Sequence, residues 1–107
     1  MNESESPRYI IFDGREVEMQ KNAAVFDTIS GKRGLTFNPE STAGCIILID
    51  DMEKNTIPEL RAAIYHIGDE TMEHKVVKAQ MEMMLEMKEE RLLSEFLRSS
   101  LFYKRIE

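Results

Sequence analysis

The stretch CIILIDDMEKNTIPEL, residues 45–60, contains the change from strand to helix that decides the fold class. Its first five residues are all apolar, which is typical of a strand covered on both faces, so we expect residues 45–49 to be the central strand of a sheet. Thr56 and Glu59 have the spacing of a capping box, in which each side chain accepts a hydrogen bond from the other residue's backbone. Pro58 fits the first turn of that helix, where its missing N–H costs little. The stretch therefore predicts a buried strand, a short loop and a helix.

Upstream of this stretch, the sequence predicts a β-hairpin. Two segments, 8–12 and 15–19, flank Asp13-Gly14, and Asp-Gly supplies the positive φ angles that a type I′ turn requires. A two-residue loop fixes the register and puts four apolar side chains on one face: Ile10, Phe12, Val17 and Met19. Glu16 and Glu18 then point to the other face.

A second, weaker strand pair is expected from residues 23–29 and 35–37, joined by a turn over 30–34 that exposes two cations. Residues 38–44 are expected to form a loop, because they combine Asn, Pro, Ser and Gly. These segments predict a small, mostly antiparallel sheet over about residues 8–50.

Two helices are expected after the sheet. One apolar face repeats at intervals of three and four residues: Ile57, Leu60, Ile64 and Ile67. This predicts a helix over 57–67, and Gly68 suits the position just past its end. Asp69 or Thr71 can cap a second helix over about 72–98, which the serines at 99 and 100 are expected to fray.

The fold class predicted from these elements is α+β, with a small mostly antiparallel sheet followed by two helices. At 107 residues the chain is expected to be a single domain, residues 1–107, with residues 1–7 as a flexible N-terminus.

The second helix carries more apolar surface than a small domain can bury. At 100° per residue, one stripe contains Val77, Met81, Met84, Leu85, Leu92, Phe96 and Tyr103. A second stripe, roughly opposite, contains Val76, Met83, Met87, Leu97 and Leu101. A helix of a small domain normally buries one such stripe.

Its length is the second reason to expect a partner. A helix over 72–101 would be about 45 Å long, against a diameter of about 34 Å for a compact domain of this size. We therefore expect the helix to protrude against a partner or a second copy, or else to break at residues 86–91.

The composition bears on the partner and on the compartment. Twenty acidic and fourteen basic residues give a net charge of −6, spread over both halves of the chain. An evenly acidic chain is repelled by phosphate backbones, so nucleic acid is not an expected partner. No apolar run approaches the roughly 18 residues that span a bilayer, so no membrane partner is expected. The start has no signal-peptide pattern, and the single Cys45 suggests a reducing compartment, so the cytoplasm is the expected location.

Three groups of residues are candidates for chemistry. Asp50-Asp51 follows the apolar strand, and paired carboxylates at a strand end can hold Mg²⁺, so the alternative function is a small metal-assisted enzyme. His66, Glu70 and His74 are spaced four apart as zinc ligands on a helix can be, but Gly68 is expected to break that alignment. Cys45 has no neighbouring cation to stabilise a thiolate, so we expect an inert thiol. We expect no catalytic residue, no bound metal and no cofactor.

The function that the sequence favours is a non-catalytic protein-binding module. Its expected contact residues lie on the second apolar stripe and on the acidic face of the hairpin: Val76, Met83, Met87, Leu97, Leu101, Glu16 and Glu18. Methionine is common at adaptable binding surfaces, which favours Met83 and Met87 as contacts. The module is expected to be an adaptor or regulator, or an inhibitor of the immunity or antitoxin type that covers a basic enzyme. Its expected partner is another protein, itself as a homodimer, or both.

Overall fold

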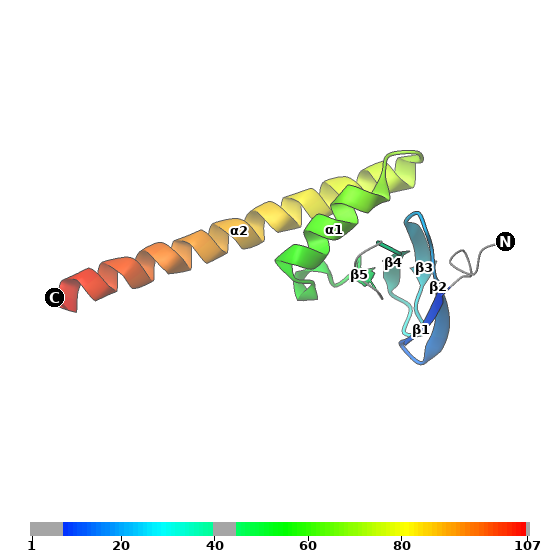
Figure 1. Ribbon diagram of the computed structural model, residues 1–107, viewed down its shortest axis with the longest axis horizontal. Coiled ribbons are helices and arrows are strands. Elements are labelled where there is room, and N and C mark those ends of the chain that lie inside the picture. The colour runs from blue at the N-terminus through cyan, green and yellow to red at the C-terminus, as the bar shows by residue number, and fades with distance from the viewer. Residues whose placement is uncertain (1–7, 40–44, 107) are drawn as a thin grey trace.

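Two antiparallel sheets followed by two helices make up the fold, as a computed structural model shows (Figure 1). The structure describes residues 8–39 and 45–106, and the side chains of residues 8–39 and 45–99. In chain order the elements are β1 (Arg8–Phe12), β2 (Arg15–Met19), β3 (Ala24–Asp27), β4 (Arg33–Phe37), β5 (Cys45–Leu48), the short 3₁₀ helix η2 (Met52–Lys54), α1 (Ile57–Ile67) and α2 (Met72–Ile106). The predicted α+β class is confirmed. Two predicted segments, residues 1–7 and the part 40–44 of the loop, lie outside the described residues.

The hairpin of β1 and β2 forms with the predicted turn and register. Asp13 and Gly14 both have positive φ, 56° and 77°, as a type I′ turn requires. Ile10 pairs with Val17, and the alternation buries Val17 and Met19 while Glu16 and Glu18 are exposed.

The second sheet has the strand order β3-β4-β5, with both pairs antiparallel. The prediction that residues 45–49 form the central strand is wrong, because β4 is central and β5 pairs with β4 alone among the described strands. Ile47 of β5 is fully buried, and Ile46 and Leu48 on its other face are half-buried, so the apolar run reflects coverage of both faces. The open backbone edge is closed locally, because the Leu48 N–H donates to Oδ1 of the buried Asn55 at 3.1 Å.

The turn before β4 is shorter than predicted, because Arg33 and Gly34 already belong to the strand. Gly34 pairs with Phe26 of β3, and a Cβ atom on Gly34 would lie 2.7 Å from the Phe26 ring. The absence of a side chain at this position lets the aromatic ring lie across the neighbouring strand.

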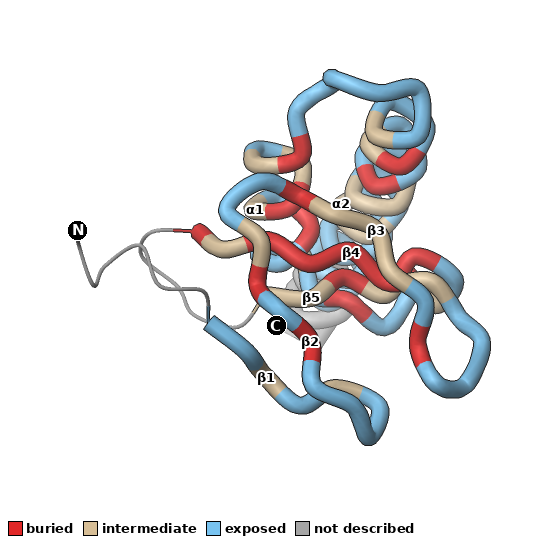
Figure 2. Tube along the Cα trace, turned by 90° about the vertical axis from the view of Figure 1, so that its right-hand side faces the viewer, coloured by how far each residue is buried: buried red, intermediate tan, exposed pale blue. Residues whose placement is uncertain are grey.

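The elements stack in layers, with the core between the three-stranded sheet and the helices (Figures 1 and 2). The hairpin contacts the sheet through β2 and β4, α1 covers β4 and β5, and α2 lies against α1. Figure 2 shows the buried residues concentrated along β4 and on the facing turns of α1 and α2. The largest fully buried side chains are Phe37, Leu35, Ile47, Leu60, Met81 and Val77.

Helix α1 begins and ends as predicted. The Thr56 backbone N–H donates to the Glu59 carboxylate at 2.9 Å, and the Glu59 N–H donates to the Thr56 hydroxyl at 3.3 Å, which completes the capping box. Gly68, with φ of 70°, ends the helix. The Thr71 hydroxyl then accepts from the His74 N–H at 3.0 Å, so Thr71 rather than Asp69 caps α2.

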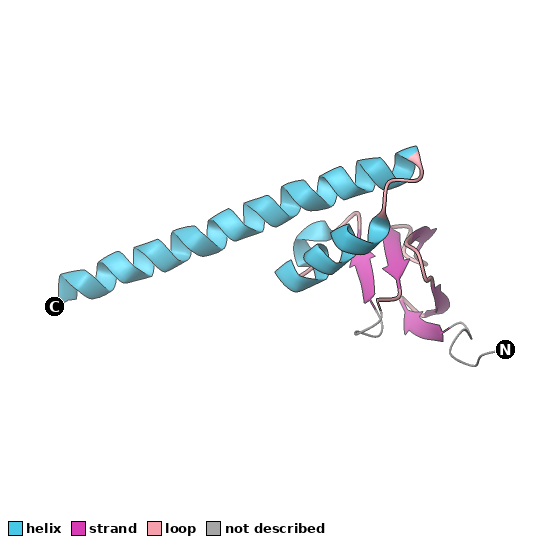
Figure 3. Cartoon of the chain, turned by 45° about the horizontal axis from the view of Figure 1, so that its top comes forward, coloured by secondary structure: helices cyan, strands magenta, loops and turns pink. Residues whose placement is uncertain are grey.

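Helix α2 is longer than predicted. It is continuous from Met72 to Ile106, so it neither breaks at residues 86–91 nor ends near residue 98. The residues at 86–91 are good helix formers, and Ser99-Ser100 costs too little helix propensity to end a helix alone. The helix extends beyond α1 on one side (Figure 3). The chain has principal extents of 63 × 28 × 28 Å and a radius of gyration of 17.2 Å, against about 13 Å for a compact domain of this length.

Candidate functional site

The first half of α2 is anchored to the rest of the protein. Val77 and Met81 are buried in the core, with Met84 and Leu85 packed half-buried beside them. Two polar contacts follow near the start of α1: the Lys88 ammonium donates to the Glu53 carbonyl of η2 at 2.6 Å, and Arg61 of α1 pairs with Glu89 at 2.5 Å. Every residue from 90 to 99 is exposed. The helix therefore leaves the core at about residue 89.

The first predicted stripe is buried along only part of its length. Its residues up to Leu85 contact the core. Leu92 and Phe96 lie beyond the last contacts of α2 with α1 and are exposed. Tyr103 lies outside the part of the helix whose side chains the structure describes.

The second predicted stripe is exposed throughout the described part. Val76, Met83, Met87 and Leu97 are 50–63% exposed, while the Leu101 side chain lies outside the described part. Between Met87 and Leu97, the residues on the same side of the helix are Glu90 and Ser94, so polar side chains divide the stripe. Its apolar surface is therefore not continuous along the helix.

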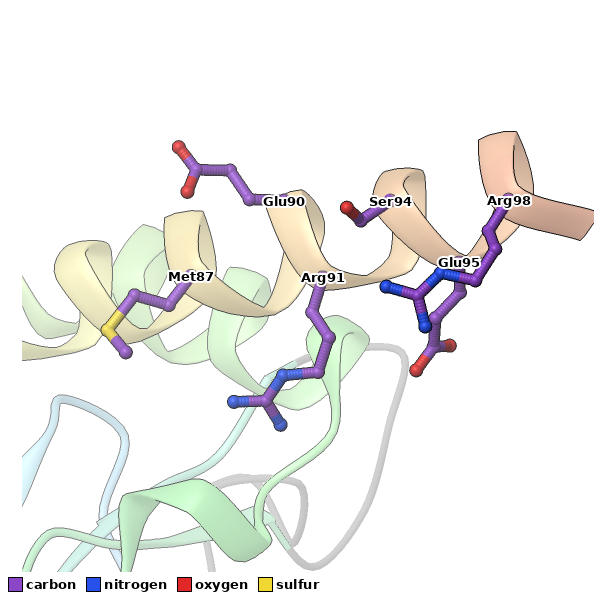
Figure 4. Close-up of a pocket in the computed structure, with 6 residues that line it drawn as sticks. All are labelled: Met87, Glu90, Arg91, Ser94, Glu95 and Arg98. Carbon is purple, nitrogen blue, oxygen red and sulfur yellow. The ribbon is translucent and has the colours of Figure 1, made fainter.

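A shallow hollow of about 460 Å³ marks this polar interruption (Figure 4). Its lining residues all come from α2: Met87, Glu90, Arg91, Ser94, Glu95 and Arg98. Figure 4 shows these side chains spread along one helix, with Arg91 on the side of the core and Glu90 turned away from it. A hollow with walls from a single helix has no opposing wall to enclose a small molecule, so it does not form a ligand pocket.

The continuous apolar surface of α2 lies on a different side. Four large side chains at positions i, i+1, i+4 and i+5 are each 51–67% exposed and form what we call the terminal patch: Leu92, Leu93, Phe96 and Leu97. At 100° per residue they cover an arc of about 140°, away from the residues that line the hollow.

Sequence reasoning missed Leu93 as a member of this surface. Its angle falls between the two stripes, so it belonged to neither, although the i, i+1, i+4, i+5 spacing of the four residues was visible in the sequence. The patch became apparent only in the folded structure, where α1 covers α2 up to about residue 89 and leaves the later residues of the first stripe exposed.

The acidic face of the hairpin is a separate surface. Glu16 and Glu18 are exposed on β2, opposite Ile11 and Tyr9 of β1, which are also exposed. The hairpin lies on the far side of the three-stranded sheet from the helices (Figure 1). The predicted contact residues therefore fall on two surfaces and do not form one site.

The carboxylates of Asp50 and Asp51 are already engaged by cations. Asp50 accepts from the Arg33 backbone N–H at 2.9 Å and from its Nε at 3.2 Å, and Asp51 pairs with Lys32 and, at 4.0 Å, with Lys54. The hydrogen bond from the Arg33 backbone lowers the pKa of Asp50, and that from Lys32 lowers the pKa of Asp51. The two cations predicted to be exposed in the turn before β4 are therefore ion-paired, which ties that turn to the end of β5.

The other candidates for chemistry are separated or shielded. His66 stacks on Phe37 with ring centres 5.6 Å apart, and the end of α1 at Gly68 separates it from His74 on α2. Burial, followed by the negative charge of Glu59, raises the pKa of the Cys45 thiol and so disfavours the reactive thiolate. Within the described residues, no three His, Cys, Asp or Glu side chains are grouped so as to hold a metal ion.

Comparison with protein-family models, with curated proteins and with solved structures finds no match to this chain. In the described part of the chain, no helix is both long and apolar enough to cross a membrane.

Proposed function

We propose that this protein is a non-catalytic protein-binding module, and that its partner binds the free surface of α2. The observation that carries the proposal is the terminal patch: four large apolar side chains, all more than half exposed, on a helix that extends past the rest of the fold. Contiguous exposed apolar surface of this kind usually marks an interaction site, because leaving it in water costs free energy.

The ion pairs made by Asp50 and Asp51 favour this proposal over a metal-assisted enzyme. A divalent cation would have to displace the Lys and Arg groups that already neutralise both carboxylates. The ion pairs give Asp50 and Asp51 a structural purpose, because they hold the turn before β4 against the loop after β5.

Within this function, an adaptor or regulator is favoured over an inhibitor of a basic enzyme. An adaptor would use the apolar terminal patch, whereas charge-led capture of a basic enzyme would use Glu16 and Glu18 on the hairpin. Binding through the patch should survive high salt, and binding through the acidic hairpin should weaken strongly, because salt screens exposed charges.

The proposal is tested by placing a photo-crosslinking amino acid at position 93 in the full chain, in cells of the organism from which it comes. A matched variant carries the same amino acid at Ser94, one residue away on the polar side of the helix. We expect protein adducts from position 93, seen as discrete bands and identified by mass spectrometry, and far fewer from position 94.

A second substitution links the adducts to the patch. Phe96→Glu in the crosslinking chain should abolish the adducts from position 93, because a carboxylate replaces one of the four apolar side chains. Equal adducts from positions 93 and 94, or adducts that survive Phe96→Glu, would remove the support for α2 as the binding surface.

A further inference from the structure

The terminal patch fits a second copy of itself. From this we infer that the protein forms a homodimer in which two α2 helices pair antiparallel through Leu92, Leu93, Phe96 and Leu97. This inference names the partner for the protein-binding function proposed above, and it rests on that function.

The amount of exposed surface is the first argument for a second copy. The chain exposes 7779 Å². A compact monomer of 12.4 kDa would expose about 6,100 Å². The surplus of about 1,700 Å² is twice the roughly 800 Å² that each partner buries in a standard interface. The exposed surface is therefore large enough to include an interface of standard size.

The spacing of the patch is the second argument, because it is self-complementary about a two-fold axis. If the axis lies between residues 94 and 95, Leu92 lies on the same edge of the interface as Phe96 of the second copy, and Leu93 lies on the other edge beside its Leu97. The two-fold repeats both contacts, so all four apolar side chains of each copy gain a partner. In the same register residue 90 lies opposite residue 99, so the exposed segment 90–99 pairs with itself beyond the last contacts of α2 with the core at Lys88 and Glu89.

The charge pattern on either side of the patch is the third argument, and it favours an antiparallel over a parallel arrangement of the two α2 helices. Residues 82–90 contain four Glu and one Lys, whereas residues 98–106 contain three basic residues and no acid. An antiparallel pair places the acidic segment of each copy beside the basic segment of the other, and Glu86 falls within one residue of Lys104 of the second copy. A parallel pair would place like charges together, which is unfavourable.

The first experiment measures the oligomeric state of the full chain by sedimentation velocity between about 1 and 200 µM, the range in which a moderate dimer dissociates. We expect a concentration-dependent dimer. Leu93→Glu should raise its dissociation constant at least tenfold, and the control Ser94→Glu, with the same new charge on the polar side, should change it less than threefold. Circular dichroism checks that both variants stay folded, which we expect because neither position contacts the core.

The second experiment reads the direction of the helices. Cys45→Ser removes the native thiol, and a spin label is placed at Ala79→Cys, an exposed position outside the paired segment. The inferred axis puts the two labels about 46 Å apart along the helices. A parallel pair would hold them at about the interhelical distance of 10 Å, widened by the label arms.

The third experiment tests the charge pairing. Glu86→Lys and Lys104→Glu should each weaken the dimer severalfold, and the double variant should recover the dimer. Residues 86 and 104 are about 27 Å apart along one helix, so recovery can arise only between copies.

The outcomes separate this inference from the function on which it rests. A monomer at 200 µM overturns the homodimer, whereas the function still stands if position 93 forms adducts with another protein. A short label distance, or no recovery in the double variant, overturns the antiparallel register. A homodimer that Leu93→Glu and Ser94→Glu weaken equally overturns the patch as its interface.

Discussion

Phe26 and Gly34 show how one residue without a side chain shapes the sheet. The two residues are paired across β3 and β4, and the Phe26 ring occupies the space that a Cβ atom on Gly34 would take. The ring also makes an edge-on contact with Phe12 of the hairpin, with centres 6.1 Å apart. Gly34 therefore lets one aromatic side chain connect the two sheets.

We predict that Gly34→Ala destabilises the protein by about 1–3 kcal/mol, the usual cost of overpacking. The added methyl group would lie 2.7 and 2.8 Å from two ring carbons of Phe26, so the ring must move and its contact with Phe12 is disturbed. Urea unfolding measures the change. The control is the same substitution in a Phe26→Ala background, where the ring atoms nearest to the methyl group are absent. An equal loss in both backgrounds would show that the ring is not the cause.

At the scale of elements, the lateral order of the strands shows the limit of an apolar pattern. The run at residues 45–49 indicated correctly that both faces of the strand are covered. It could not show which strands lie beside β5, because side chains report on the faces of a sheet whereas strand order depends on backbone pairing. The role of Asn55 could not be predicted from the pattern either, since its hydrogen bond with the Leu48 backbone forms only once η2 has folded beside the strand.

The ion pairs between the turn before β4 and the loop after β5 predict a dependence of stability on pH. The pKa values of Asp50 and Asp51 are lowered in the folded state, so the unfolded chain binds protons more readily. Their contribution is therefore present above the ordinary Asp pKa of 3.8 and is lost as the pH falls through the lowered folded-state values.

We expect Asp50→Asn and Asp51→Asn to destabilise the protein at about pH 6, and the difference from the unaltered chain to shrink as the pH falls below the ordinary Asp pKa and the native carboxylates become protonated. Thermal unfolding of both variants and of the unaltered chain across this range measures the difference. A difference that stays constant at every pH would show that the charges do not cause it.

At the scale of the whole molecule, the protein divides into a packed part and an extended helix. The core ends where Lys88 contacts η2 and Glu89 contacts α1. The described residues beyond this point are all exposed, so they contribute little to the folding of the rest.

We predict that a chain ending at residue 91 folds with nearly the same thermal unfolding midpoint as a full-length chain that carries Leu93→Glu and Phe96→Glu. The comparison uses two chains that lack the terminal patch, so any stabilisation by self-association is removed from both. Small-angle scattering should show the radius of gyration falling from 17.2 Å toward the roughly 13 Å of a compact domain. A large loss of stability on truncation would mean that residues 92–106 support the core.

Elements with local signals could be predicted from the amino-acid sequence alone. The Asp13-Gly14 turn, the hairpin register, the Thr56–Glu59 capping box and the end of α1 at Gly68 each depend on a few neighbouring residues, whose backbone preferences and hydrogen bonds act over one turn. The excess apolar surface of the second helix was also visible, because periodicity alone reveals it.

Which part of that surface is free depends on how the helices pack in the folded protein. Whether Leu85 or Leu92 is covered depends on where α1 begins beside α2, and that point depends on contacts between segments far apart in the chain. For the same reason, only the fold placed Glu16 and Glu18 on the opposite side of the sheet from α2. Local preferences specify elements, but the burial of a given face is a property of the packed molecule.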